Sequence, residues 1–425
     1  MILLSLELQG FRNFTSLSLP LDSRGAVLEA PNGRGKTNFL EAIHYLSLFR
    51  SFRGAPDSEV ASFGTRSFVL HGELTREGDR RTGIGVAVDG ARKRLAVDGR
   101  AGRPAEHVGT ALSVVLCPED IRLVQGSPGR RRRYLDVVLA LSSARYFHAL
   151  QEYRRVLRHR NSVLQSGTQA DVALLEPWTE GLLRHGAVIL RERLRFLTRW
   201  GPRFAEISAQ LAGTSAGALS WRYESSSLPA GEAVEASLRQ VVSVEQPVSI
   251  GQAEASGMLA LPDQDGGPAS YQPAARRPSA DFPDAPGLDD VTAALRAELE
   301  RRAWLERRRG VTLVGPHRDD LSFHSLEPSG AERDLRKFGS QGEQRTAALS
   351  LRFLELEVLS HERGELPVVL LDDVFSELDP RRSRELLGFL APGQQVFLTT
   401  PKPLALDTSL DLPRYTIAEG TVRAA

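Results

Sequence analysis

Over the first 125 residues, apolar positions alternate with polar ones or gather in short runs separated by Gly- and Asp-containing turns. Alternation with a period of two and short apolar runs are typical of β-strands. The predicted strands are Ile2–Leu8, Ala26–Glu29, Phe68–Leu74, Gly83–Val88 and Leu112–Leu116. One helical pattern interrupts them at 37–49, where Phe39, Ile43, Leu46 and Phe49 share a side.

From about residue 128 the apolar spacing becomes that of long amphipathic helices. The stretches 129–165, 178–200 and 289–310 each predict helix. No heptad pattern runs on for hundreds of residues, as long coiled-coil arms would require. Residues 230–287 are rich in Ser, Ala, Pro, Gly and Asp with few large apolar side chains, so we expect a flexible insertion there.

Strand patterns return at 311–315, 320–326, 368–373 and 394–400, with a helical pattern ending near His361. Strand-rich segments 1–125 and 311–425 therefore bracket a helical segment, 126–310. The pattern predicts an α/β domain that is discontinuous in sequence, with an inserted α-helical domain.

Composition adds little. The chain has 425 residues, 41% of them hydrophobic and 25% charged, with a net charge of +1, as in ordinary soluble proteins. Fifty of the 54 basic residues are Arg, which fits either codon bias or phosphate binding. A single cysteine, Cys117, excludes an internal disulfide and fits a reducing compartment. With no basic leader and no apolar run of about 18 residues, we expect a cytoplasmic protein without membrane contact.

The stretch "EAPNGRGKTNFLEAI" carries the first strong chemical signal. Gly33 and Gly35 allow a backbone whose N–H groups point at phosphate oxygens, Lys36 reaches the β- and γ-phosphates, and the Thr37 hydroxyl can bind Mg²⁺. A strand precedes the loop and a helix follows it, as a P-loop requires. Position 30 departs from the usual Gly. The predicted ATP-binding loop comprises Ala30, Pro31, Asn32, Gly33, Arg34, Gly35, Lys36, Thr37 and Asn38.

A second segment completes a nucleotide site in this interpretation. The apolar strand "VVLLDD" (368–373) ends in two carboxylates. We expect Asp372 to hold the metal and Asp373 to position or deprotonate the attacking water. Because Asp is one methylene shorter than Glu, we expect slow hydrolysis, with Asp373 and Lys36 as the catalytic residues.

The stretch "KFGSQGEQRTAAL" (337–349) places Ser340 and Gly342 before a helical pattern. A hydroxyl, free amides and a helix dipole can form an anion site. Ser340 with Glu343 three residues later can equally form a capping box. The local residues leave both interpretations open.

Together these motifs resemble ABC-type ATPase heads. "SQGEQR" is similar to their signature loop, "DD" with "SELD" (376–379) to their Walker B motif and D-loop, and "FRNF" (11–14) to a motif beside the nucleotide. Three further stretches, at 118–136, 312–321 and 372–379, closely resemble the RecF family of recombination mediators. The resemblance spans most of the chain outside 225–290.

The resemblance implies a head-to-tail dimer that holds two ATP molecules. Each ATP would lie between the P-loop and Asp372 of one copy and the signature loop of the other, with Asp379 at the same interface. The signature residues are Ser340, Gln341 and Gly342. By the same resemblance Arg12 and Asn13 lie near the nucleotide, and Thr399 or Thr400 takes the switch position. A Q-loop glutamine is not assigned; the segment 118–120 is where one is expected.

The resemblance further implies a weak DNA-dependent ATPase that binds DNA when ATP-bound, as duplex or at single-strand junctions. It would act with RecR and RecO to load RecA at gapped DNA. The candidate DNA contacts are Arg130, Arg131, Arg132, Arg133, Arg154, Arg155 and Arg158. These arginines could instead form solvated helix faces paired with acids.

Two other classes share the nucleotide motifs. A transporter ATPase subunit carries its signature loop about a hundred residues after the P-loop, whereas Lys36 and Ser340 are 304 positions apart. An SMC-type chromosome or break-repair ATPase needs long heptad arms, which this chain lacks.

Overall fold

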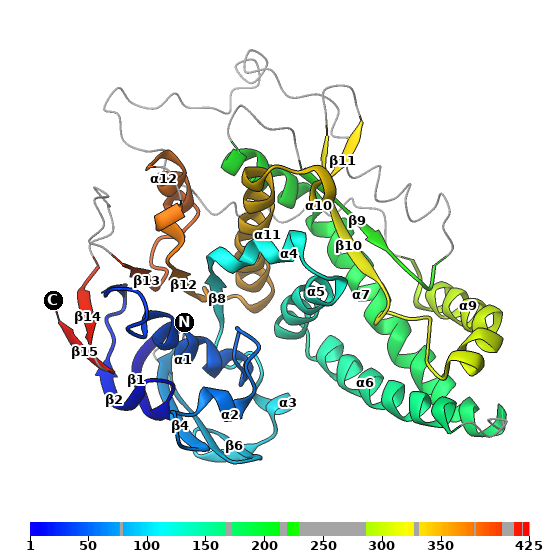
Figure 1. Ribbon diagram of the computed structural model, residues 1–425, viewed down its shortest axis with the longest axis horizontal. Coiled ribbons are helices and arrows are strands. Elements are labelled where there is room, and N and C mark those ends of the chain that lie inside the picture. The colour runs from blue at the N-terminus through cyan, green and yellow to red at the C-terminus, as the bar shows by residue number, and fades with distance from the viewer. Residues whose placement is uncertain are drawn as a thin grey trace. The chain divides into compact units, whose positions relative to one another are not determined.

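The computed structural model of the protein describes residues 1–425 except 77–79, 167–171, 213–218, 229–285, 327–330, 378–379, 402–411, 419 and 425. The chain forms two compact units. The first contains Met1–His148, Gln344–Ser383 and Pro392–Ala425, and the second contains Ala149–Glu343 and Arg384–Ala391. Both units are discontinuous in sequence (Figure 1).

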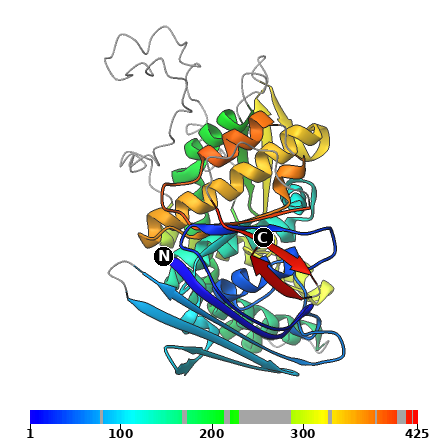
Figure 2. The ribbon, with the colours of Figure 1, turned by 90° about the vertical axis from the view of Figure 1, so that its left-hand side faces the viewer.

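An antiparallel six-stranded sheet forms one layer of the first unit. In spatial order its strands are β2 (Phe14–Pro20), β1 (Ile2–Phe11), β4 (Ser67–Thr75), β5 (Arg81–Asp89), β6 (Arg92–Val97) and β7 (Arg100–Gly102). Buried and exposed side chains alternate along β4 and β5, so one face packs on the core. Figure 2 shows its long blue strands, and the C-terminal strands in the same unit.

A mostly parallel sheet forms the other layer. In spatial order its strands are β15 (Thr421–Ala424), β14 (Arg414–Ala418), β3 (Gly25–Glu29), β13 (Val396–Thr400), β12 (Val368–Asp372) and β8 (Ser113–Leu116). The strands β8, β12 and β13 are buried along their whole length, which explains their continuous apolar runs. Helix α1 (Lys36–Leu48) contacts strands of both sheets, and one apolar core joins all three.

Shorter elements complete the first unit. They are α2 (Asp57–Val60), α3 (Pro104–His107), η1 (Pro118–Ile121), α4 (Arg122–Gln125), α5 (Pro128–Ser142) and η4 (Val374–Glu377). The sequence boundaries between the units fall within three helices, namely α6 (Ala144–Gln165), α11 (Gln341–Arg363) and α12 (Pro380–Gly388). Helix α5 belongs to the first unit because Tyr134 Oη donates to Leu351 O at 2.7 Å.

The second unit combines helices with a small sheet. Its remaining elements are α7 (Val172–Ala212), α9 (Leu288–Arg309), α10 (Leu335–Phe338), β9 (Leu219–Glu224), β10 (Asp320–Leu326) and β11 (Glu332–Asp334). The sheet runs β11-β10-β9, all antiparallel. Helix α9 has two acidic residues in its first turn and three arginines in its last turn, which interact favourably with the helix dipole. It ends at Gly310, whose φ of 64 is typical of a helix C-cap.

The first two boundaries between the units lie at 148/149 and 343/344, whereas the sequence predicted them at 125/126 and 310/311. Residues 311–343 join the helical unit because β10 pairs with β9. The expected strand at 311–315 is wrong, because several of its N–H groups donate to side chains instead of to a neighbouring strand. Thr312 N donates to Asn161 Oδ1 at 2.8 Å, and Leu313 N donates to Glu306 Oε1 at 2.7 Å.

The other expected elements can be compared directly. The five early strands, the helix after the P-loop and the helices at 178–200 and 289–310 are confirmed. The stretch 129–165 is two helices, because Ser143 adopts an extended backbone (φ −139) between α5 and α6. The expected insertion at 230–287 lies almost entirely outside the described residues. No helix in the described part of the chain is both long and apolar enough to cross a membrane.

Candidate nucleotide-binding site

The loop between β3 and α1 has the backbone of a phosphate cradle. Gly33 and Gly35 have φ values of 80 and 102, and α1 begins directly afterwards at Lys36. The φ of Gly35 favours glycine, and a Cβ there would lie 2.3 Å from Asn13 Nδ2 and displace that side chain. Four unpaired N–H groups at the start of a helix favour an anion.

Ala30 fits the loop despite the departure from Gly. It is not among the described residues with positive φ, and only 6% of its surface is exposed. Its N–H donates to Thr400 O at 3.3 Å, which joins the loop to β13. A methyl group is therefore accommodated there without backbone strain.

Lys36 is buried and turned onto its own loop. Its Nζ donates to Ala30 O at 2.5 Å and to Pro31 O at 3.2 Å. Burial lowers the pKa of Lys36, while the nearby charges of Asp373 and Asp372 act in the opposite direction. A bound phosphate would place a negative charge beside this buried ammonium group and so stabilise its charged form.

Asp372, at the end of β12, lies in a hydrogen-bonded cluster with two threonines. Thr37 Oγ1 donates to Asp372 Oδ1 at 3.0 Å, and Thr399 Oγ1 donates to the same oxygen at 2.8 Å. Burial raises the pKa of Asp372, and these two hydrogen bonds partly oppose the rise. Helix α1, β12 and β13 thus converge at one carboxylate.

Asp373 follows in a strained backbone conformation, with φ 51. Its N–H donates to Thr399 Oγ1 at 2.9 Å, which fixes the turn. Its Oδ1 atom is buried and has no hydrogen-bond partner among the described residues. A non-glycine residue with positive φ and an unsatisfied buried carboxylate oxygen are features of functional sites.

These residues suit a magnesium ion. Mg²⁺ prefers oxygen ligands and usually takes one or two carboxylates together with substrate phosphates and water. The Thr37 hydroxyl and the Asp372 carboxylate supply such oxygens 3.0 Å apart. The unsatisfied Oδ1 of Asp373 can accept a hydrogen bond from a water molecule.

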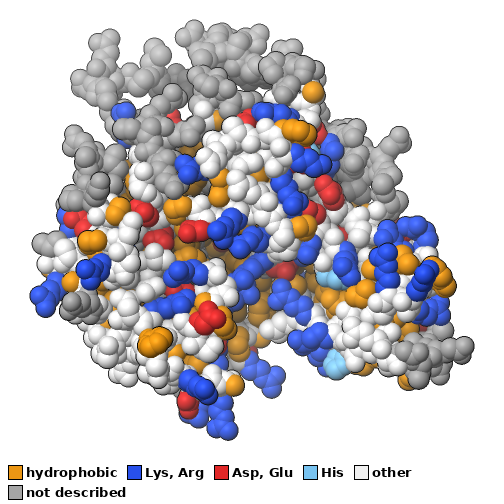
Figure 3. All heavy atoms as spheres, viewed as in Figure 1, with side chains coloured by type: hydrophobic (Ala, Val, Ile, Leu, Met, Phe, Trp, Pro, Cys, Tyr) orange, Lys and Arg blue, Asp and Glu red, His pale blue; other side chains and the backbone are white. Residues whose placement is uncertain are grey.

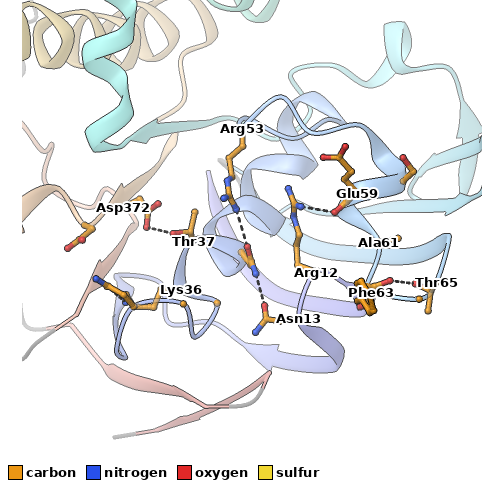
Figure 4. Close-up of a pocket in the computed structure, with 18 residues that line it drawn as sticks. Arg12, Asn13, Lys36, Thr37, Arg53, Glu59, Ala61, Phe63, Thr65 and Asp372 are labelled. Carbon is orange, nitrogen blue, oxygen red and sulfur yellow. Dashed lines mark hydrogen bonds between the residues drawn. The ribbon is translucent and has the colours of Figure 1, made fainter.

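A cavity of about 930 Å³ joins these groups to the turn after β1. Figure 4 shows Lys36, Thr37 and Asp372 on one side of it, with Arg12 and Asn13 further along. Asn38 Nδ2 donates to Asn13 Oδ1 at 2.7 Å, and Arg53 Nη1 donates to Asn38 Oδ1 at 3.4 Å.

Arg12 has a second role that the sequence did not indicate. Its Nε and Nη2 atoms each donate to a carboxylate oxygen of Glu41 at 2.8 Å, and Nη1 donates to Glu59 O at 2.6 Å. Glu41 is fully buried in α1. The guanidinium group of Arg12 therefore holds a buried charge besides lining the cavity.

The signature stretch begins α11 and lies in the second unit. Ser340 N donates to Glu343 Oε2 at 2.7 Å, and Glu343 N donates to Ser340 Oγ at 3.2 Å. Burial tends to raise the pKa of Glu343, but the hydrogen bonds from Ser340 and the charge of Arg333 outweigh it and lower the pKa. The capping box is thus the local geometry: Ser340 caps α11, and Gln341 and Gly342 begin its first turn. Asp379 lies outside the described residues.

The candidate basic contacts differ in accessibility. Arg130, Arg133, Arg154, Arg155 and Arg158 are exposed. The expectation that Arg131 contacts DNA is corrected, because this side chain is only 2% exposed. Its Nη1 donates to Gly126 O at 2.7 Å and to Val124 O at 3.2 Å, so it stabilises the turn between α4 and α5. Arg155 pairs with Glu152 at 2.8 Å. Lys and Arg side chains recur across the face drawn in Figure 3.

Comparisons with known proteins agree with this geometry. The model of the RecF/RecN/SMC N terminal domain matches residues 2–412. The chain is 35% identical over 440 residues to the DNA replication and repair protein RecF of Thermomicrobium roseum, covering 99% of both chains. It is also 35% identical over 434 residues to the same protein of Acidothermus cellulolyticus, covering 100% of both. The chain belongs to the RecF family.

Solved structures of that family have the same fold. Two structures of the recombination mediator protein RecF in the RecFOR pathway give TM-scores of 0.78 and 0.77 at 27% identity. They cover 99% and 100% of this chain and 97% of each of those chains, and the second is a RecF-ATP structure. The fold is therefore that of an ABC-type ATPase head with a helical unit.

Sequence reasoning missed some residues of the site. Thr399 was one of two candidates for the switch position, and only β13 pairing places its hydroxyl on Asp372. Phe63 lines the cavity and was not singled out; an aromatic residue between Ser62 and Gly64 in a turn could have signalled it. In the segment expected to hold a Q-loop, Asp120 accepts from Cys117 N at 2.9 Å and from Arg352 Nη2 at 2.6 Å.

Proposed function

We propose that this chain binds and slowly hydrolyses ATP with Mg²⁺, and that ATP switches its DNA binding in recombination mediation. The observation that carries the proposal is the cluster of Thr37, Asp372 and Thr399 beside the P-loop lysine. It brings a hydroxyl, a carboxylate and a cation to one cavity, as a Mg²⁺-nucleotide site requires. The ATP-bound family structure, similar over the whole chain, supports the same assignment.

Each residue has a task in hydrolysis. The amides around Gly33 and Gly35 and the ammonium group of Lys36 hold the β- and γ-phosphates. Thr37 and Asp372 hold the metal, which when bound neutralises charge on the phosphate oxygens. Asp373 orients a water molecule toward the γ-phosphorus and accepts its proton as the bond to the β-phosphate oxygen breaks. Its short side chain fits slow turnover, as in a switch.

ATP would also act as an interface between two copies of the chain. In this proposal the signature turn of one copy, Ser340 to Gly342, faces the γ-phosphate held by the other copy, with Asp379 nearby. The positive end of the α11 dipole favours an anion, and the capping box fixes the turn that carries Ser340 there. Hydrolysis would then weaken the dimer.

Sedimentation velocity with and without ATP and Mg²⁺ tests this step. Wild type should be monomeric without nucleotide and dimeric with ATP, and Ser340→Arg should stay monomeric because a bulky cation blocks the turn. Ser18→Arg, at an exposed position of β2, is the matched control and should dimerise. A wild-type monomer under all conditions would refute the dimer mechanism.

DNA binding is assigned to the exposed arginines of α5 and α6. Removing one arginine that binds a phosphate should reduce the slope of log K against log salt by about 0.9. We expect Arg130→Ala and Arg158→Ala each to lower the ATP-dependent affinity for duplex and gapped DNA together with this slope. Arg24→Ala, an exposed arginine paired with Asp22, is the control. An unchanged salt slope in both variants would remove this surface from the proposal.

The pathway named for the family structures suggests the partners. We propose a weak DNA-dependent ATPase that acts in the cytoplasm with RecR and RecO to load RecA at gapped DNA. A reconstituted assay of RecA loading should require wild type and fail with Lys36→Ala. Loading that is equally fast without this chain would contradict the role.

A further inference from the structure

Phe63 is the most exposed large apolar residue of the described chain. Its relative exposure is 106%, and it lines the same cavity as Lys36 and Asp372. Figure 4 shows Phe63 and Thr65 on the opposite side of the drawn site from Lys36 and Asp372, with Arg12 and Asn13 between them. The ring therefore stands uncovered at the rim of the cavity, and a ligand that covered it would gain the free energy of removing its apolar surface from water.

The turn that carries Phe63 is held in place. Thr65 N and Thr65 Oγ1 donate to Ser62 O at 2.9 and 2.8 Å, and Ser62 N donates to Gly10 O at 2.7 Å. Gly64 has φ +82 and open space around it, as a turn with a left-handed third residue requires. The hydrogen bonds therefore hold Phe63 outward without the ring taking part in the apolar core.

The rest of this end of the cavity offers few charges for a phosphate. Ala61, Phe63 and Gly64 present a methyl group, a ring and bare backbone. Two guanidinium groups line the cavity between its ends: that of Arg12 is held by Glu41 and by Glu59 O, and that of Arg53 donates to Asn38 Oδ1 at 3.4 Å. The cationic end of the cavity is the P-loop, with Lys36. The cavity thus has a phosphate end and an apolar, aromatic end.

We propose that Phe63 stacks on the nucleobase of the bound nucleoside triphosphate and is the main contact of this chain with the base. The inference rests on the proposed ATP site and assigns its other end. Every purine has a π-face that an aromatic ring can cover, so stacking contributes affinity without reading hydrogen-bond edges. We therefore expect Phe63 to favour nucleotides over phosphate chains, with weak discrimination between ATP and GTP.

Titration calorimetry on the full chain with Mg²⁺ tests this assignment, using ATP and inorganic tripolyphosphate as probes. Tripolyphosphate fills the P-loop but has no base. Phe63→Ala should weaken ATP binding roughly 5- to 100-fold and leave tripolyphosphate binding within about twofold. Phe63→Trp and Phe63→Tyr should retain ATP binding within about threefold. Val69→Ala, at another exposed apolar residue of the same unit, is the matched control and should change neither affinity.

A spectroscopic readout separates stacking from a merely structural role. All four native tryptophans, at positions 178, 200, 221 and 304, lie in the second unit. The fluorescence that Phe63→Trp adds over wild type should therefore be quenched by ATP and not by tripolyphosphate.

Two failures are distinguishable. A wild-type chain that binds neither probe would refute the proposed ATP site itself. If wild type binds both probes but Phe63→Ala weakens them equally or not at all, the site stands and the stacking assignment is wrong. A Phe63→Ala variant that fails only to dimerise, with normal ATP affinity, would likewise overturn it and assign the ring to contact with a second copy.

Discussion

The pair formed by Arg12 and Glu41 offers a quantitative test of what the "FRNF" turn does. Glu41 is completely buried in α1, and Arg12 meets both of its carboxylate oxygens at 2.8 Å from a backbone with φ 54. Besides Arg12, the carboxylate accepts from the Ser51 hydroxyl, and Arg53 lies 3.9 Å away with half of its side chain exposed. Replacing Arg12 by Met keeps an unbranched apolar stem and removes the guanidinium group that makes both strong contacts.

The expected cost follows from burial. Removing one partner of a buried ion pair leaves an uncompensated charge and typically costs about 3–5 kcal/mol. For a unit of this size, a loss of that magnitude lowers the melting temperature by on the order of 10 °C. Arg12→Met/Glu41→Gln should recover part of the loss, because the buried group is then neutral and Ser51 can still pair with it.

The assay is thermal unfolding without nucleotide, which excludes any effect of Arg12 on ATP. Arg24→Met is the matched control: Arg24 pairs with Asp22 at 3.0 Å, but the two side chains are 51% and 30% exposed. An exposed pair of this kind contributes at most about 1 kcal/mol.

The reasoning fails if Arg12→Met costs no more than Arg24→Met, or if the double variant is no more stable than the single one. Either result would mean that Arg12 acts on the nucleotide alone.

Three further changes test the site and its surroundings. Asp372→Asn keeps a hydrogen-bond acceptor for Thr37 and Thr399 but removes the charge at the metal. The ATPase rate should therefore fall roughly 100-fold or more with an unchanged melting temperature. A metal-dependent rate within threefold of wild type would contradict the assignment. Gly35→Ala should weaken ATP binding more than about tenfold in calorimetry, and more than Gly33→Ala, since a Cβ at Gly35 meets Asn13 while one at Gly33 meets nothing within 4 Å. Burial lowers the pKa of His44 from 6.5 to about 3, so protonation favours the unfolded chain and stability is lost as the pH falls from about 6.5 toward 3. Between pH 7 and pH 5, denaturant unfolding of wild type should lose about 2 kcal/mol more than that of His44→Gln, and equal losses would refute the burial argument.

Local sequence predicted the local parts of this molecule well. The helices α7 and α9 follow from residue spacing, since a helix satisfies its own backbone and buries one periodic face, while the P-loop and the apolar strand ending in Asp372 follow from their local residue types. The capping box at Ser340 is likewise a relation between residues three positions apart. The strand expected at 311–315 was wrong because two of its N–H groups donate to side chains, one of them Asn161, which is 151 positions away, and the other Glu306 at the end of the preceding helix.

The sequence by itself determined the chemistry of the nucleotide end and the kind of fold, because those depend on neighbouring residues. Only the tertiary structure decided which groups meet. Parallel pairing of β12 with β13 places the Thr399 hydroxyl within hydrogen-bonding distance of Asp372. Packing of α1 buries Glu41 where Arg12 pairs with it, and burial of Arg131 removes this residue from the DNA-binding candidates. The first two contacts join residues 27 and 29 positions apart, and the energies of all three depend on burial, which no local pattern records.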